Sequence, residues 1–166
     1  MPTLQKISSC LWFDDQAEEA ANFYMSVFKN SELGRVCRYT KEGYEIHKMP
    51  AGTVMTVEFF LEGERFIALN GGPVFKFSEA ISFIINCDTQ EEIDYYWEKL
   101  SEGGDEKSQQ CGWLKDKYGL SWQVVPTALA NMFLDHESEG AERAMKAMLQ
   151  MKKLDIEKLQ LAYNPA

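Results

Sequence analysis

Two periodicities in the spacing of apolar residues divide the first 126 residues of the chain. Runs in which apolar and polar residues alternate predict strands, whereas apolar residues three or four positions apart predict helices. Strands are predicted at 8–13, 33–40, 54–62, 65–70, 81–86 and 111–126, the last being two strands around a turn, and helices at 17–28 and 89–100.

The order of these elements indicates a duplication. Aligning the Glu-Glu pairs at 18–19 and 91–92 brings two strand–helix segments into register. We therefore predict two β-α-β-β-β repeats, at about residues 7–73 and 80–126. The strand after the second helix is poorly defined, because residues 101–110 are polar and rich in glycine.

Both predicted helices carry the spacing of a capping box at their start. The pairs are Asp15 with Glu18 and Thr89 with Glu92. Residues 41–53 form a long loop, either a flexible excursion or a lid over a site. The segment therefore marks a candidate edge of a binding site.

The hairpin at 111–126 is the best-defined stretch of the sequence. Gly119 stands where a turn needs a positive φ, and the side chain of Asp116 can stabilise the turn. Trp122 lies on the apolar face of the second strand and is predicted to be buried, whereas Trp113 is predicted to be partly accessible. Beyond Pro126, three helices are predicted at 127–134, 141–151 and 156–163, with Thr127 and Asp155 as N-caps.

Composition narrows the class of protein. The 166 residues, 45% of them hydrophobic, suit one folded domain or two closely fused halves, and the net charge of −9 argues against nucleic acid or an anionic membrane as a partner. No apolar run approaches bilayer length, and the first residues lack the apolar region of a signal peptide. The four cysteines form no C-x-x-C pair, so we expect reduced thiols in a cytoplasmic protein.

Three segments, 10–24, 68–73 and 112–126, resemble the PhnB-like branch of the vicinal oxygen chelate superfamily. This superfamily contains glyoxalase I, extradiol dioxygenases and the bleomycin and fosfomycin resistance proteins, and the branch is often labelled the 3-demethylubiquinone-9 3-methyltransferase domain. The resemblance implies an α+β fold in which paired β-α-β-β-β modules form a cupped mixed sheet. It also implies one glyoxalase-like domain over residues 1–126, followed by a C-terminal helical extension at 127–166.

The resemblance further implies positions for metal ligands. Metal enzymes of the superfamily hold a divalent ion with four His or Glu side chains from the first and last strands of each repeat. The corresponding positions here are Ser8, Cys10 or Trp12, Asn70, Ala80 or Ser82, and Gln123. None is a histidine or a carboxylate, and the two histidines, His47 and His136, lie in the long loop and in the tail. We therefore predict neither a metal nor another cofactor.

What remains in the predicted cup is a set of amides, hydroxyls, thiols and aromatic rings suited to a small, flat organic molecule. The candidate ligand-binding residues are Cys10, Trp12, Asn70, Ser82, Cys111, Trp113 and Gln123. The alternative for Asn70 and Gln123 is that their amides satisfy strand ends, and for the cysteines that they are buried and inert.

The sequence leaves the reaction, if any, open. Besides metal-independent binding, the alternatives are a methyltransferase of the 3-demethylubiquinone type and a metal-dependent lyase or dioxygenase of the same superfamily. The chain lacks a glycine-rich strand-to-helix loop for S-adenosylmethionine. We also expect a homodimer, because the predicted half-sheets leave strand edges to be covered.

Overall fold

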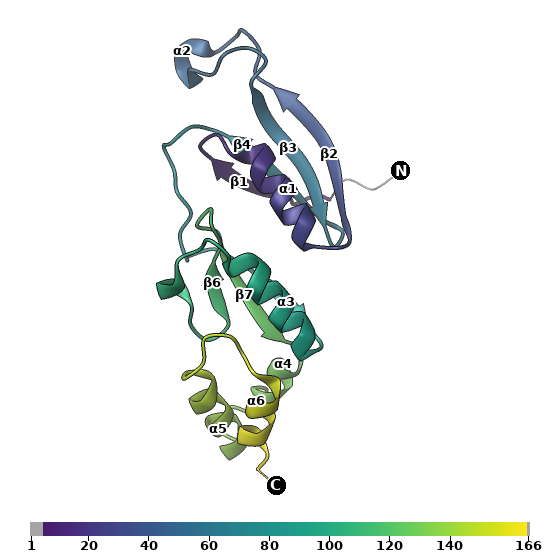
Figure 1. The fold of residues 1–166 in the computed structure, drawn as a ribbon, viewed down its shortest axis with the longest axis vertical. Helices are drawn as coiled ribbons and strands as arrows, with labels where there is room; N and C mark the ends of the chain where they lie inside the picture. Colours follow the sequence, from purple (N-terminus) through teal and green to yellow (C-terminus); the bar gives the residue numbers. More distant parts are fainter. Residues whose placement is uncertain (1–4, 166) are drawn as a thin grey trace. The chain divides into compact units, whose positions relative to one another are not determined.

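The computed structural model describes residues 5–165, which fall into two compact units. The first unit ends at Lys76 and the second begins at Phe77, so the division lies in the segment between the predicted repeats, and the C-terminal tail belongs to the second unit. Each unit contains a small mixed sheet with a helix packed on it (Figure 1). The predicted α+β fold is confirmed.

The sheet of the first unit has four strands in the order β1-β4-β3-β2. β1 runs parallel to β4, and the other neighbours are antiparallel. The elements are β1 (Ser9–Phe13), α1 (Ala17–Val27), β2 (Ser31–Arg38), α2 (Tyr44–His47), β3 (Val54–Leu61) and β4 (Glu64–Asn70). The short helix α2 lies inside the predicted long loop.

The core of the first unit lies between α1 and the sheet. Alternate residues of each strand point to this side, and Leu11 and Phe13 of β1 are buried there. Phe59 of β3 stacks on Tyr24 of α1 and on Phe66 of β4, with ring centroids 6.2 and 5.5 Å apart. These aromatic contacts fix α1 on the sheet.

The start of α1 differs from the prediction. The helix begins at Ala17 and its N-cap is Gln16, whose side chain accepts no capping hydrogen bond. The predicted Asp15/Glu18 capping box is therefore wrong. An amide from β4 takes its place, because Asn70 accepts the hydrogen bond of the Ala17 N–H.

The sheet of the second unit has three strands in the order β5-β7-β6, with β5 parallel to β7. The Thr89/Glu92 capping box at the start of α3 is confirmed. No strand follows α3 among residues 102–112; a 3₁₀ helix stands there, capped by the side chain of Asp105. The elements are β5 (Ser82–Cys87), α3 (Gln90–Ser101), the 3₁₀ helix (Glu106–Ser108), β6 (Trp113–Lys115) and β7 (Ser121–Pro126).

Asp116 organises the turn between β6 and β7, as predicted. It is 2% exposed, and its Oδ1 accepts hydrogen bonds from the backbone N–H groups of Tyr118 and Leu120, at 2.9 and 3.1 Å. Its Oδ2 accepts a hydrogen bond from Nε1 of Trp122 at 2.9 Å. Gly119 has a φ of +85°, which suits glycine. The burial of Trp122, at 3% exposure, is confirmed.

The tail forms three helices that pack on one another. Asp155 caps the last of them by accepting from the Lys158 N–H, as predicted. Thr127 makes no cap; its hydroxyl donates to Asp88 instead. The helices are α4 (Ala128–Met132), α5 (Glu139–Met148) and α6 (Ile156–Tyr163), and their core is Met132, Ala144, Leu154 and Leu159.

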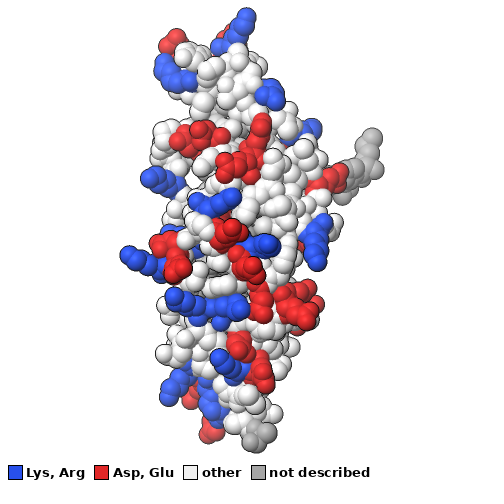
Figure 2. Space-filling view, viewed as in Figure 1, with Lys and Arg blue, Asp and Glu red and all other residues white. Residues whose placement is uncertain are grey.

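Charged side chains of both signs are interspersed over the face in view in Figure 2, without a continuous patch of one sign. No helix within residues 5–165 has the length and hydropathy needed to cross a bilayer.

Candidate functional site

Each sheet has a face that points away from its own helix, and most of the predicted site residues lie there. We call it the distal face. On the first sheet it carries Cys10, Trp12, Thr56, Glu58, Phe60, Arg65, Ile67 and Leu69. On the second sheet it carries Ser82, Ile84, Trp113, Lys115, Ser121 and Gln123.

Cys10 and Trp12 lie together on the distal face of the first sheet. Cys10 is exposed, but nearby sheet atoms desolvate its thiol and raise its pKa, so the cysteine is not activated as a nucleophile. Trp12 is half-buried: its Nε1 donates to the carbonyl of Gly72 at 2.9 Å, and its ring meets Phe75 edge-on. A Cβ on Gly71 would overlap this ring, so the glycine lets the backbone lie against the indole.

Asn70 lies on the helix-facing side of the first sheet, which differs from its predicted position in the cup. Its Oδ1 accepts from the Ala17 N–H at 2.8 Å, and its Nδ2 donates to the carbonyl of Val54 at 3.1 Å. Both ends of this buried amide therefore serve the backbone of the first unit. Asn70 acts here as the cap of α1.

The strand registers explain why Asn70 and Gln123, both predicted to lie in the cup, lie on opposite faces of their sheets. Asn70 ends β4 and Pro126 ends β7, so these two residues correspond in the two repeats. Gln123 lies three residues before Pro126, and its counterpart three residues before Asn70 is Ile67. An odd shift of three residues moves a side chain to the other face of a strand.

On the second sheet, three predicted residues come together. Trp113 is the register partner of Gln123 across the β6–β7 pair, and Nε2 of Gln123 donates to Oγ of Ser82 at 2.9 Å. Ser121 lies on the same face, 1% exposed, and its Oγ is the one buried side-chain oxygen or nitrogen of residues 5–165 without a hydrogen-bond partner. Cys111 lies outside this face, in the turn before β6, where its N–H donates to Met151.

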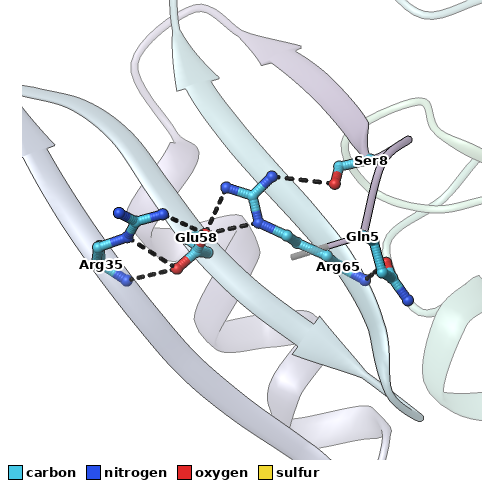
Figure 3. Close-up of polar contacts among 5 residues, drawn as sticks. All are labelled: Gln5, Ser8, Arg35, Glu58 and Arg65. Carbon is cyan, nitrogen blue, oxygen red and sulfur yellow. Dashed lines mark hydrogen bonds and ion pairs between the residues drawn. The ribbon is translucent and has the colours of Figure 1, made fainter. Parts of the chain in front are cut away.

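A charged network on the first sheet was missed by sequence reasoning. Glu58 of β3 is 9% exposed and contacts the guanidinium groups of Arg35 and Arg65 (Figure 3). Nε of Arg65 donates to Glu58 Oε2 at 2.6 Å, and its Nη1 donates to Oγ of Ser8 at 3.0 Å. The backbone N–H of Arg65 donates to Oε1 of Gln5. The available signal was a single carboxylate within a strand of mainly apolar residues.

The two arginines determine the charge state of Glu58. Hydrogen bonds from the Arg35 side chain, opposed by desolvation and reinforced by Arg65, lower the pKa of Glu58 to about 2. The carboxylate thus stays ionised at any physiological pH. Gly34 makes room for it, since a Cβ at Gly34 would lie 2.5 Å from Glu58 Oε1.

The residues at the superfamily's ligand positions do not fit a metal ion. The predicted positions carry Ser8, Cys10 or Trp12 in the first repeat and Ala80 or Ser82 with Gln123 in the second, and Ile67 replaces Asn70 as the counterpart of Gln123. Hydroxyl, amide and alkyl side chains are poor ligands for zinc or iron, and a single thiol does not make a site. Within the described residues 5–165, no group of three or more His, Cys, Asp or Glu is placed to hold a metal. His47 accepts the Met49 N–H through Nδ1, inside the α2 loop.

Comparison with known proteins identifies the family. The family model described as 3-demethylubiquinone-9 3-methyltransferase matches residues 5–125. The chain belongs to this family. It is 37% identical to the PhnB protein from Bacillus cereus, with a TM-score of 0.63, over 74% of this chain and 100% of that one.

Two more distant structures share the fold. Protein PA1353 from Pseudomonas aeruginosa is 20% identical, with a TM-score of 0.56 over 75% of this chain and 98% of that one. The fosfomycin resistance protein FosX from Listeria monocytogenes is 13% identical, with a TM-score of 0.53 over 79% and 98%. This chain thus has the glyoxalase fold of the vicinal oxygen chelate superfamily. No protein of curated function matches the chain.

Proposed function

We propose that this PhnB-like protein binds a small organic molecule without a metal ion, using the distal faces of its sheets. The observation that carries the proposal is the grouping of Trp113, Gln123 and Ser82 on one face of the second sheet. A planar apolar group can stack on the half-buried indole of Trp113. A hydroxyl or carbonyl can meet the amide of Gln123, of which only one end is engaged by Ser82.

The buried hydroxyl of Ser121 supports the same site. It lies two residues from Gln123 on the same face, and an unpaired buried hydroxyl is costly unless something satisfies it. Because the Ser121 oxygen has no exposed surface, a ligand group near Gln123 reaches it only after neighbouring side chains move. On the first sheet, Cys10 and Trp12 offer a thiol and an indole for contacts of the same kind.

Native mass spectrometry of the purified chain tests this proposal. We expect a co-purifying small molecule that is retained by the variant Gln160→Ala, which changes an exposed glutamine of α6. The variant Gln123→Ala is expected to lose the molecule while keeping its thermal unfolding midpoint within a few degrees. Equal retention by both variants would remove Gln123 from the site.

The absence of a metal requirement is tested separately. Protein purified without a histidine tag is expected to contain far less than one equivalent of zinc, nickel, iron or manganese, and a chelator is expected to leave its stability unchanged. The physical reason is the lack of His and carboxylate side chains at the ligand positions. One equivalent of metal whose removal lowers stability would contradict the proposal.

The family description makes a methyltransferase the second candidate. Calorimetric titration with S-adenosylmethionine decides between the two, because saturable micromolar binding would favour methyl transfer over simple binding.

We also propose that the protein is a cytoplasmic homodimer. The support is that the outer strands of the two sheets, β1 and β2 in the first and β5 and β6 in the second, each pair on one side only among the described strands.

A further inference from the structure

A cavity of about 550 Å³ lies within the first unit, beside the Glu58 network. Arg35, Arg65 and Glu58 line one part of it, and Phe60 and Gly63 line another. The volume falls in the range of sites for small organic ligands. Glu58, Phe60 and Arg65 belong to the distal face of the first sheet, so this inference deepens the proposed function. None of the residues in the Trp113–Gln123 grouping lines the cavity, so failure of one site leaves the other testable.

We propose that this cavity binds a small organic anion, whose carboxylate or phosphonate group pairs with the guanidinium of Arg35. The charge of the network favours an anion, since two guanidinium groups face one buried carboxylate. The network therefore carries one positive charge in excess. Glu32, the other carboxylate that lines the cavity, is exposed and screened by water.

Arg35 is the group free to meet the anion. Its side chain is 73% exposed, and Nε and Nη2 each lie 3.3 Å from the Glu58 carboxylate, which leaves Nη1 without a partner among the described residues. Arg65, in contrast, is 14% exposed and held by Glu58 and Ser8. Glu58 therefore keeps a counter-ion when Arg35 turns toward a ligand. A planar guanidinium suits bidentate pairing with an oxyanion.

The local backbone supports a binding role for this part of β2. The pairing of β2 with β3 is irregular between Leu33 and Val36, a distortion typical of sheet edges and binding sites. Gly34 stands at this irregularity and leaves space for the Glu58 carboxylate. The side chain of Phe60 supplies an apolar surface for the carbon skeleton of the ligand.

Titration of the isotope-labelled full chain by two-dimensional NMR tests the proposal at constant ionic strength. The probes are benzoate, phenylphosphonate and the neutral analogue benzamide. We expect saturable shifts of the Gly34 and Arg35 amides with at least one anion, and none with benzamide. The anion that binds more tightly identifies the headgroup, carboxylate or phosphonate.

Variants assign the binding to Arg35. The change Arg35→Gln is expected to weaken the anion about tenfold or more, in keeping with the loss of charge-assisted hydrogen bonds, and Arg35→Lys is expected to weaken it less. The matched control is Arg38→Gln, since Arg38 is on the same strand but outside the cavity, bonded to the carbonyl of Gly52. Equal affinity in Arg35→Gln and the wild type, or equal binding of benzamide, would overturn the proposal.

Discussion

At the scale of single residues, the two tryptophans of the β6–β7 hairpin have different roles. Trp122 is buried against Phe83, with ring centroids 5.6 Å apart, and its Nε1 is bonded to Asp116. Trp113 lies on the distal face and is half-buried. The alternation of a strand, rather than the residue type, separates a core ring from a candidate ligand contact.

Replacing Trp122 with alanine is expected to cost about 3–5 kcal/mol of stability, because it empties a large core site. It also leaves the Asp116 carboxylate with one fewer donor. Trp113→Ala is expected to cost much less but to impair ligand binding. Urea melts of both variants measure the difference, and a nearly neutral Trp122→Ala beside an unfolded Trp113→Ala would invert the assignment of faces.

Glu58 gives a pH-dependent prediction. Its pKa is lowered from an ordinary value of 4.5 to about 2 in the folded protein, so its contribution to stability is present above about pH 4.5 and is lost as the pH falls toward 2. Glu58→Gln is expected to cost about 3 kcal/mol at neutral pH, the low end for breaking a buried ion pair.

Urea melts of the wild type and Glu58→Gln at pH 7, 4 and 3 check this dependence. The difference in unfolding free energy between the two proteins is expected to shrink as the pH falls below 4.5. A difference that stays constant down to pH 3 would show that the two arginines do not hold the carboxylate in its ionised form.

At the scale of elements, the two helices that cover the sheets start in different ways. α3 is capped locally, by Thr89 and Glu92 of its own first turn. α1 is capped from a distance, by Asn70 at the end of β4. The second arrangement ties the helix to the sheet and makes its start depend on tertiary structure.

Asn70→Ala is therefore expected to destabilise the first unit by about 1–3 kcal/mol for each buried backbone group left unpaired, the Ala17 N–H and the Val54 carbonyl. Gln16→Ala, a change at the N-cap residue that makes no side-chain cap, is the control and is expected to be nearly neutral. Denaturant melts and amide exchange at residues 17–20 measure both effects. Similar losses for the two variants would reject the tertiary cap.

At the scale of the whole molecule, the chain is two units built on one plan but completed differently. The first unit has a fourth strand, β2, at its edge, and the second has a 3₁₀ helix and a helical tail. Gln90 of α3 contacts that tail through both ends of its amide. Its Nε2 donates to the carbonyl of Leu154, and its Oε1 accepts from the N–H of Ile156. The tail is thus an integral part of the second unit.

The proposed homodimer is tested at this scale. Light scattering after gel filtration is expected to give twice the 19.1 kDa mass of the chain. The reason is that the open edge strands of a sheet are normally covered. The net charge of −9 makes two chains repel one another. Because salt screens this repulsion, the dimer is expected to dissociate less at moderate than at very low salt. A monomer at tens of micromolar would contradict the proposal.

The sequence by itself determined the features that depend on neighbouring residues. Alternation in the hairpin predicted the burial of Trp122, the Asp116 turn was readable from its residues, and the Thr89/Glu92 spacing predicted a real capping box. These signals are local, because a turn or a cap is formed by residues two to six positions apart.

Only the tertiary structure decided which distant groups meet. Asn70 turned out to cap a helix 53 positions away, because a register fixed by hydrogen bonds between strands sets the face on which it lies. The contacts of Glu58 with Arg35 and Arg65 likewise required three strands to lie side by side. Pairing between strands is not encoded in the local pattern of any one of them, so charge networks across a sheet emerge only once the sheet is formed.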